Sequence, residues 1–500
     1  MKALISVYNK DGLIDFISSL GNKIDEIYAT EGTLKYLNEN NVKAKSSSLL
    51  TGFDDLLDGR VKTLHPAIFS GLLSKRDEKS EGQLKKYNYF DFDLLICNLY
   101  PFREAAKSNN LDRMIENIDI GGLSLIRAAA KNYKNVTVLS DPEDYAYVKN
   151  EMEKNNEISM KTREYLALKA FSRSADYDIA IYNNLYKKLN NEEPDEFFVH
   201  GYDKYPLRYG ENPDQEGFMY KTDNKYGIPN SIQLNGMELS YNNILDANAA
   251  LETVQDFDET TSVIVKHRTP SGVSSAETLK EAFINSYNAD PESAYGFVVA
   301  VNRKLDLETA NEMKHKFIEV LIAPDYDEDA LNLLKKKKNL RILRSNMEKD
   351  NNYAVSSISG GILIQTRLTY RYDKLELKSN KEAGKEKLDD LLFAWKVVAH
   401  TKSNAMVLAK NKTTVGIGAG QTSRIESLKI AIDRGNDNVN GSVLASDAFI
   451  PFDDSVIECN KYGIDGIIEP GGSIRDDDVI KRCNEYNIPL YFTGKRVFLH

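Results

Sequence analysis

The sequence predicts a mixed α/β protein with mostly parallel sheets, organised in two domains. In residues 1–190 short apolar runs alternate with helical stretches, and the same mixture resumes over residues 196–500. Alternation of this kind is typical of parallel strands with helices on the faces of the sheet. The segment between the two regions, residues 190–195, is polar and contains a proline, so we place the domain boundary there.

The first domain offers four apolar runs as strands, at residues 3–7, 27–30, 94–98 and 136–140. Helical stretches at 12–20 and 34–40 separate the first runs, and a helix-rich region is expected over 142–189. Ligands of open α/β sheets bind at the carboxyl ends of the strands. The turns that follow these runs are therefore where a site is expected.

The second domain has a comparable series of strand-like runs, at residues 262–266, 297–301, 320–323, 405–409, 464–469 and 490–493. The basic run 335–338 is expected to end a surface helix, because cations suit a helix C-terminus. The charged segment 378–387 lacks large apolar residues and is expected to be a surface loop.

Composition favours a cytoplasmic enzyme that acts on small anions. The chain has 65 Lys and Arg against 75 Asp and Glu, a net charge of −10, which argues against broad nucleic-acid binding. Its three cysteines are far apart and its six histidines are scattered, so neither a disulfide framework nor a metal site is expected. The first residues read as a strand, and no apolar run is long enough to cross a membrane.

A loop at residues 58–66 is the strongest local indication of an anion site. It places Arg60, Lys62, Thr63 and His65 between two apolar segments. Guanidinium, ammonium and hydroxyl donors together suit a phosphate or carboxylate. A solvated basic turn that binds nothing is the alternative for this loop taken alone.

Several other turns carry the same kind of donor. Glycine-containing turns that lead into helices expose backbone N–H groups, which attract anions. Asp119 could accept a hydrogen bond from an amide, and Tyr100, beside a cation such as Lys62, could stabilise an oxyanion. A plain turn or helix cap remains the alternative at each position. The candidates in these turns are Ser6, Lys10, Thr30, Gly32, Thr33, Tyr100, Asp119, Gly121 and Gly122.

In the second domain an apolar strand ends in Lys266 and His267, followed by a Thr-Pro-Ser-Gly turn. This pair suits a general base with an electrostatic stabiliser, although a solvated strand end is an equal alternative. Arg208 offers a further phosphate donor in a tight turn.

Taken together, the motifs resemble one family, the bifunctional AICAR transformylase/IMP cyclohydrolases of purine biosynthesis. The similarity extends over essentially the whole chain, in order. The matching segments are 6–10, 58–66 (DGRVKTLHP), 98–102 (NLYPF), 117–132, 207–213 (LRYGENP), 266–267, 290–296 (DPESAYG), 403–405, 416–424 (GIGAGQTSR), 446–452 (SDAFIPF), 470–475 (PGGSIR) and 496–500.

For the first domain the resemblance implies a methylglyoxal-synthase-like parallel sheet that closes the purine ring of formyl-AICAR to give IMP. It places the phosphate near the turn residues already named and near Arg60 and Thr63. Lys62, Tyr100 and Asp119 would act on the reacting groups, with Lys131 beside them. Glu31 departs from the glycine usual in the family, and its carboxylate would repel a phosphate unless it points outward.

For the second domain the resemblance implies two cytidine-deaminase-like halves without zinc. This region would transfer a formyl group from 10-formyltetrahydrofolate to AICAR, with sites that form across a homodimer. His267 would take the amine proton, Lys266 would stabilise charge and Asn404 would hold the formyl oxygen. The ribotide candidates are Arg208, Tyr209, Arg424 and Arg496, and the folate candidates are Phe449 and Asp454.

Three positions depart from the family pattern in this domain: Thr269, Ser271 and Asp214 stand where Asn, Cys and His are usual. Two alternatives therefore stay open beside the bifunctional enzyme. One is a cyclohydrolase whose transformylase half is weak or uses another formyl carrier, such as a modified pterin. The other is a non-catalytic protein that binds purine ribotides.

Overall fold

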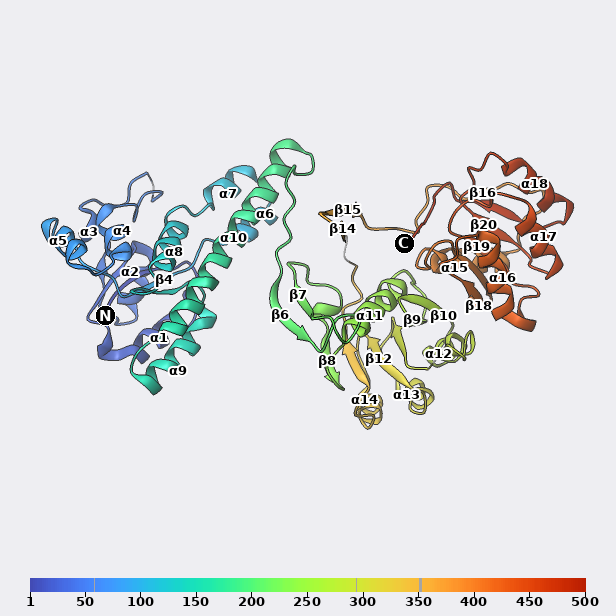
Figure 1. Cartoon of the computed structure of the whole chain (residues 1–500), viewed down its shortest axis with the longest axis horizontal. Helices are drawn as coiled ribbons and strands as arrows, with labels where there is room; N and C mark the ends of the chain where they lie inside the picture. Colours follow the sequence, from blue (N-terminus) through green and yellow to red (C-terminus); the bar gives the residue numbers. More distant parts are fainter. Residues whose placement is uncertain (58, 294, 350–352) are drawn as a thin grey trace. The chain divides into compact units, whose positions relative to one another are not determined.

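The computed structural model describes residues 1–57, 59–293, 295–349 and 353–500. It divides into two compact units, residues 1–200 and 201–500, and each is described by itself (Figure 1). Asp58, the first residue of the anion loop, lies outside the described residues, as does Ala294 within the motif 290–296.

The first unit is built on a five-stranded parallel sheet with strand order β3-β2-β1-β4-β5. Its central strands are continuous apolar runs and are buried, as strands covered on both faces must be. The strands are β1 (Lys2–Ser6), β2 (Glu26–Ala29), β3 (Lys45–Ser46), β4 (Leu94–Cys97) and β5 (Thr137–Leu139).

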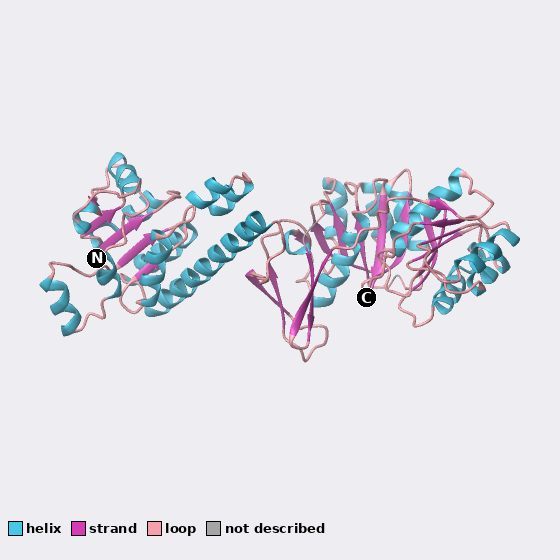
Figure 2. Cartoon of the chain, turned by 90° about the horizontal axis from the view of Figure 1, so that it is seen from above, coloured by secondary structure: helices cyan, strands magenta, loops and turns pink. Residues whose placement is uncertain are grey.

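Helices pack against this sheet (Figure 2). The longest of them, α10, runs for 31 residues along α8 and β5. The helices of the unit are α1 (Leu13–Leu20), α2 (Glu31–Glu39), α3 (Ser48–Thr51), α4 (Pro66–Leu73), α5 (Glu78–Lys86), α6 (Phe102–Lys107), α7 (Leu111–Glu116), α8 (Gly121–Lys131), α9 (Tyr145–Asn155) and α10 (Met160–Asn190), with 3₁₀ turns η1 (Gly21–Lys23) and η2 (Pro142–Asp144).

The second unit contains a twelve-stranded mixed sheet with the order β16-β21-β20-β19-β17-β18-β10-β9-β11-β12-β13-β8. Two further pairs, β6–β7 and β14–β15, stand outside it. The strands are β6 (Tyr202–Leu207), β7 (Gly217–Lys221), β8 (Ile232–Asn235), β9 (Thr261–Lys266), β10 (Thr269–Ser275), β11 (Phe297–Val301), β12 (Ile318–Ala323), β13 (Arg341–Arg344), β14 (Tyr353–Ile358), β15 (Gly361–Thr366), β16 (Glu376–Leu377), β17 (Met406–Lys410), β18 (Thr413–Gly418), β19 (Val443–Ser446), β20 (Ile467–Glu469) and β21 (Leu490–Phe492).

This sheet consists of two halves with the same topology. In each half an antiparallel hairpin, β9–β10 or β17–β18, lies beside three strands that are parallel to one another, and an antiparallel edge strand closes the outer side. The halves join through β10 and β18, where Ser274 pairs with Thr413. The repeat is one of arrangement, and one buried cluster contains residues of both halves.

The helices of the second unit follow the same repeat, so that α11 to α14 of the first half correspond in order to α15 to α18 of the second. Among the residues that the structure covers, no helix has the length and apolar character needed to cross a membrane. The helices are α11 (Tyr241–Val254), α12 (Leu279–Asn288), α13 (Leu307–Met313), α14 (Glu328–Lys335), α15 (Lys385–Val398), α16 (Arg424–Gly435), α17 (Asp454–Lys461) and α18 (Asp476–Glu485), with 3₁₀ turns η3 (Ile228–Asn230) and η4 (Asn436–Asn438).

One expectation about surface segments needs adjustment and another holds. The segment 378–387 is irregular only as far as Gly384, because α15 begins at Lys385 and its buried face begins with Asp390 and Leu391. The basic run 335–338 does follow a helix, since α14 ends at Lys335. The first unit continues past the polar segment 190–195 to residue 200.

Candidate active sites

The turns after β1 and β2 lie side by side in the first unit, because these strands are parallel neighbours. The Thr30 hydroxyl donates to Ser6 Oγ at 3.2 Å, and Thr33 Oγ1 accepts from the backbone N–H of Val7 at 3.0 Å. Thr30 precedes the first turn of α2, where unpaired N–H groups face outward. Ser6, Thr30 and Thr33 therefore form one polar edge suited to an anion.

Asn98, directly after β4, connects the turn that follows β4 to this edge. Its side-chain oxygen accepts from the backbone N–H groups of Tyr8 and Asn9 at 2.7 and 2.9 Å. The Tyr8 ring in turn meets Tyr100 edge to face at 5.7 Å. Sequence reasoning did not select Tyr8 or Asn98 as site residues, although both lie within segments that it quoted as motifs.

The loop that follows residue 58 carries its two cations in ion pairs within this unit. Arg60 pairs with Glu116, and Lys62 Nζ lies 3.3 Å from an Asp55 carboxylate oxygen. Thr63 is buried, and its hydroxyl lies beside Gly121 at the start of α8. An incoming anion could exchange the exposed Arg60–Glu116 pair for its own contacts at small cost, because exposed pairs are weak, whereas the Lys62–Asp55 pair is half-buried.

Asp119 joins the loop, the β4 turn and the start of α8. Its Oδ1 accepts from the backbone N–H of Gly122 at 2.7 Å. Burial raises the pKa of Asp119, while hydrogen bonds from the backbone of Gly122 and Tyr100 and the charge of Lys62 act in the opposite direction. Position 122 requires a glycine for steric reasons, because a Cβ there would lie 2.6 Å from an Asp119 oxygen. The structure therefore brings Lys62, Tyr100 and Asp119 together, as expected.

Lys131 does not join this cluster. It is the last residue of α8, whose first turn holds Gly121 and Gly122, and an eleven-residue helix is about 15 Å long. Lys131 is exposed at that far end, so the placement implied by the resemblance is not what this unit shows.

Three further residues, of which two are exposed, lie close after β1 and β2 in the first unit. Lys10 Nζ donates to the carbonyl of Tyr8 at 3.3 Å, on the turn after β1. Gly32 has open space where a Cβ would stand, so its glycine is not required by packing. Glu31, the departure from the family pattern, is exposed.

In the second unit Lys266 and His267 lie where hairpin β9–β10 turns. Lys266 ends β9, and its ammonium donates to the carbonyls of Tyr295 and Gly296 at 2.6 and 2.8 Å. His267 and Arg268 form a two-residue turn with φ of 53° and 64°. Neighbouring residues of a strand point to opposite faces, and the turn lets the adjacent Lys266 and His267 side chains leave the strand at one place.

Asn404 is the centre of a network in the second half. Its side-chain amide donates to the carbonyls of Gln421 and Thr422 at 2.9 and 3.2 Å, and its oxygen accepts from Arg424 at 2.8 Å. Arg424 is buried and also bonds to Ser446 and Asp447. Arg424 thus holds Asn404 in place and offers little free surface for a ribotide.

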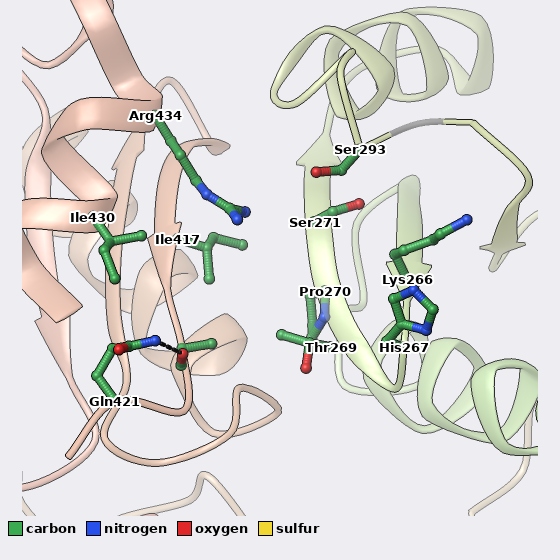
Figure 3. A pocket seen from close by; sticks show the side chains of 11 residues that line it. Lys266, His267, Thr269, Pro270, Ser271, Ser293, Ile417, Gln421, Ile430 and Arg434 are labelled. Atoms are coloured by element: carbon green, nitrogen blue, oxygen red, sulfur yellow. Dashed lines mark hydrogen bonds between the residues drawn. The ribbon is translucent and has the colours of Figure 1, made fainter.

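A cavity of about 250 Å³ connects the two halves (Figure 3). Lys266, His267 and Ser271 line it from the first half, and Ile417, Gln421 and Arg434 from the second. Because Asn404 bonds to Gln421, the His267 turn and the Asn404 network lie at the same edge of the sheet.

Two of the three residues that depart from the family pattern lie at this cavity. Thr269 and Ser271 line it directly. The Ser271 hydroxyl is buried and has no hydrogen-bond partner among the described residues. An unsatisfied buried hydroxyl is costly, so it marks a position where a ligand or water would gain a contact.

The remaining candidates lie on segments around this edge. Arg208 stacks near Tyr209 at 5.5 Å, in a turn that Asn242 of α11 binds through the carbonyl of Glu211. Arg496 is exposed, and the neighbouring Val497 donates its N–H to the carbonyl of Asp447 at 3.0 Å. Asp214, the third departure, is exposed in the turn after Tyr209.

The two folate candidates follow strand β19. Phe449 is 39% exposed, and Asp454 is exposed at the start of α17, where its Oδ1 accepts from Ser455. Next to Phe449, the N–H of Ile450 donates to Glu469, whose second oxygen has no partner among the described residues. Burial raises the pKa of Glu469 to about 8, so this carboxyl is largely protonated near neutrality.

No cluster of three or more His, Cys, Asp and Glu suited to a metal ion occurs in the part of the chain that the structure describes. The two units therefore define an α/β protein with two separate polar sites, one at the carboxyl edge of a parallel sheet and one between the halves of a duplicated sheet.

Comparison with known proteins shows which family the chain resembles. A family model described as AICARFT/IMPCHase bienzyme matches residues 129–434, and one described as MGS-like domain matches residues 12–124. Among similar proteins, the bifunctional purine biosynthesis protein PurH of Caldicellulosiruptor saccharolyticus is 47% identical over 100% of this chain and 99% of its own length. PurH of Aquifex aeolicus is 46% identical, with both chains covered completely. A solved structure titled "Crystal structure of ForH" is 30% identical over 37% of this chain and 98% of its own, with a TM-score of 0.33.

This chain belongs to the AICARFT/IMPCHase bienzyme family. It is accordingly a bifunctional AICAR formyltransferase and IMP cyclohydrolase, which serves the final two steps of IMP synthesis with a folate as the general class of formyl donor.

Proposed function

We propose that the two activities are divided between the units, with formyl transfer in residues 201–500 and ring closure in residues 1–200. One observation carries the assignment of formyl transfer. The Lys266–His267 turn and the Asn404 network lie at one edge of the sheet, with a cavity that both halves line.

In formyl transfer the 5-amino nitrogen of AICAR attacks the formyl carbon, which 10-formyltetrahydrofolate carries on N10. His267 takes the proton that the amine loses, and the ammonium of Lys266 stabilises the oxyanion on the formyl carbon. The bond from that carbon to N10 then breaks, and N10 leaves with a proton as tetrahydrofolate. The AICAR amine is weakened by conjugation, so proton removal and positioning matter most.

In ring closure the carboxamide nitrogen of formyl-AICAR attacks the formyl carbon, and water is lost to give IMP. Lys62 and Tyr100 stabilise the oxygen that leaves, and Asp119 orients the attacking amide. Their convergence on one edge supports this role, and the turns that hold Ser6, Thr30 and Thr33 offer the phosphate site beside it.

The folate would lie near Phe449 and Asp454, and the unpartnered Ser271 hydroxyl faces the same cavity as His267. The alternative of another carrier, such as a modified pterin, depends on Thr269, Ser271 and Asp214. The Ser271 hydroxyl can donate a hydrogen bond at the position where the family usually has a thiol, so the polar contact can be kept, and we retain 10-formyltetrahydrofolate, the carrier usual in the family, as the proposed donor. The expected setting is the cytoplasm.

A second copy of this chain is the expected partner. The hairpin β14–β15 stands outside the large sheet and exposes apolar side chains on both faces, so a surface of this kind favours burial against another protein. These side chains are Val355, Ile358, Ile362, Leu363 and Ile364. The His267 ring is exposed and has no hydrogen-bond partner among the described residues, which is consistent with completion of the site by a partner chain.

The test is a split assay on the purified protein. One arm supplies AICAR with 10-formyltetrahydrofolate and follows release of tetrahydrofolate, and the other supplies formyl-AICAR and follows IMP. We expect activity in both arms. IMP formation alone would mean that the carrier is different or that the transformylase half is weak, and failure of both arms despite ligand binding would favour a binding protein.

A further inference from the structure

The turn that carries His267 has an unfavourable backbone conformation. Both His267 and Arg268 have positive φ, at 53° and 64°. The left-handed region is disfavoured for residues with a Cβ, and two-residue turns of this type usually contain Asn, Asp or Gly. A contact from outside the hairpin is therefore needed to hold the turn in one arrangement.

Asp246 makes that contact. It is the sixth residue of α11, and its Oδ1 accepts from the backbone N–H of Arg268 at 2.6 Å. Burial raises the pKa of Asp246, while hydrogen bonds from the backbone of Arg268 and His267 and the charges of His267 and Lys266 act in the opposite direction. The carboxylate thus lies directly behind the turn, and the charges that act on it include those of His267 and Lys266 in the hairpin it holds.

The second half of the sheet has the same kind of contact between a helix aspartate and a hairpin turn, but that turn has no histidine. Asp390 is the sixth residue of α15 and accepts from the N–H groups of Asn411 and Lys412 at 3.0 and 2.7 Å. Asn411 and Lys412 also have positive φ, at 52° and 50°. In both halves 22 residues separate the aspartate from the second turn residue.

The two turns lie at opposite ends of the central strands. Strands β10 and β18 are antiparallel, and the carbonyl of Lys412 accepts from the N–H of Ser275, at the end of β10 far from His267. The Asp390 turn is therefore outside the cavity that His267 lines, and it provides a control within the same molecule.

We propose that Asp246 is a positioning residue for formyl transfer: its carboxylate holds the His267–Arg268 turn so that the imidazole meets the attacking amine. The proposal rests on the assignment of His267 as the base. Asp390 makes the corresponding contact with a turn that has no proposed catalytic side chain, so it is the control for a purely structural role.

The experiment compares steady-state kinetics of full-length variants in both arms of the split assay, together with thermal unfolding. For Asp246→Ala we expect kcat for formyl transfer to fall about tenfold, with KM for AICAR changed less than about threefold and ring closure unchanged. Asp246→Asn keeps an acceptor oxygen and should retain at least a third of the wild-type kcat, in round terms. For the control, Asp390→Ala, we expect a comparable loss of thermal stability with kcat for formyl transfer within about twofold of wild type.

A rescue separates positioning from general destabilisation. Glycine adopts positive φ without steric penalty, so Arg268→Gly in the Asp246→Ala background should recover most of the lost kcat. This double variant also carries the test if Asp246→Ala alone does not fold. The proposal is overturned by wild-type kcat in Asp246→Ala, by an equal loss in Asp390→Ala, or by a folded double variant that recovers nothing. Formyl transfer that survives His267→Ala would instead remove the underlying assignment of the base.

Discussion

The two hairpins of the second unit have nearly the same architecture and different chemistry. Hairpin β9–β10 turns through Lys266, His267 and Arg268, and hairpin β17–β18 turns through Lys410, Asn411 and Lys412. Each turn has two positive φ values and an aspartate from the preceding helix behind it. The comparison teaches that the scaffold supplies a pre-shaped turn twice, and that the first of these turns carries the imidazole that we propose takes the amine proton.

The largest expected effect tests that imidazole directly. His267→Ala should lower kcat for formyl transfer by about 100-fold or more, the usual contribution of a general base, while ring closure is unchanged. The matched control is Asn411→Ala, which occupies the same position in the other turn and should affect neither rate. Equal losses of both activities in His267→Ala would contradict the division of labour between the units.

The lysines before the turns form a second pair. Each ends a strand and donates to backbone carbonyls, Lys266 to Tyr295 and Gly296 and Lys410 to Asn440. Lys266→Ala should reduce kcat for formyl transfer about 10- to 100-fold, because an oxyanion loses its cation. Lys410→Ala should change this rate less than about twofold, and a large loss there would show that the ammonium acts through hairpin stability.

We expect matching substitutions in the two halves to lower the free energy of unfolding by similar amounts. A Cβ on Gly272 would lie 1.9 Å from the carbonyl oxygen of Ser286, and one on Gly416 would lie 1.9 Å from that of Ala431. Helices α12 and α16 therefore approach their hairpins at matching places. Either Gly→Ala change should lower the free energy of unfolding by about 2 kcal/mol, measured by urea denaturation. Tolerance of only one change would show that the repeat does not extend to its packing.

The smallest effect concerns a carboxyl that distinguishes the halves. Strand β20 ends in the buried Glu469, whereas β12 ends in Ala323. Because burial raises the pKa of Glu469 to about 8, the folded protein keeps this proton where the unfolded chain, with an ordinary value of 4.5, loses it. The stability that the protonated Glu469 contributes is fully present below pH 4.5, and it is lost as the pH rises through the folded-state pKa of about 8.

Glu469→Gln keeps a neutral group and should remove that loss. Its free energy of unfolding relative to wild type should improve by about 1 kcal/mol or more between pH 5 and pH 8. Unfolding curves at both pH values measure the difference. A difference that does not change with pH would mean that Glu469 is ionised in the folded protein near neutrality.

Sequence reasoning located the strands that are buried on both faces, because such strands appear as continuous apolar runs. Residues 94–98 and 262–266 are examples, and both fall on strands of the structure. It missed the hairpin β14–β15, whose apolar side chains are exposed and follow no buried pattern. It also missed β19, a four-residue strand in which Val443 is the single β-branched residue.

Sequence reasoning predicted individual site residues but not the hydrogen bonds and ion pairs that connect them. Lys62, Tyr100 and Asp119 were selected from separate turns, and the structure brings them together. The support of Asn404 could not be read from sequence, because Arg424, Ser446 and Asp447 come from different elements. Asp246 gave no signal at all, since its role depends on a turn 22 residues later. Lys131 was placed by resemblance, and one helix length separates it from the cluster.

The order of strands in the duplicated sheet has a consequence for how the chain is made. Each half begins with its outer edge strand, β8 or β16, and this strand pairs with the last strand of the same half, β13 or β21. During synthesis the first segment of each half must therefore wait, unpaired, until the whole half has left the ribosome. Long-range pairing of this kind makes folding slow and exposes strand edges to aggregation. We therefore expect the second unit, and not the first, to limit the yield of folded enzyme during rapid expression.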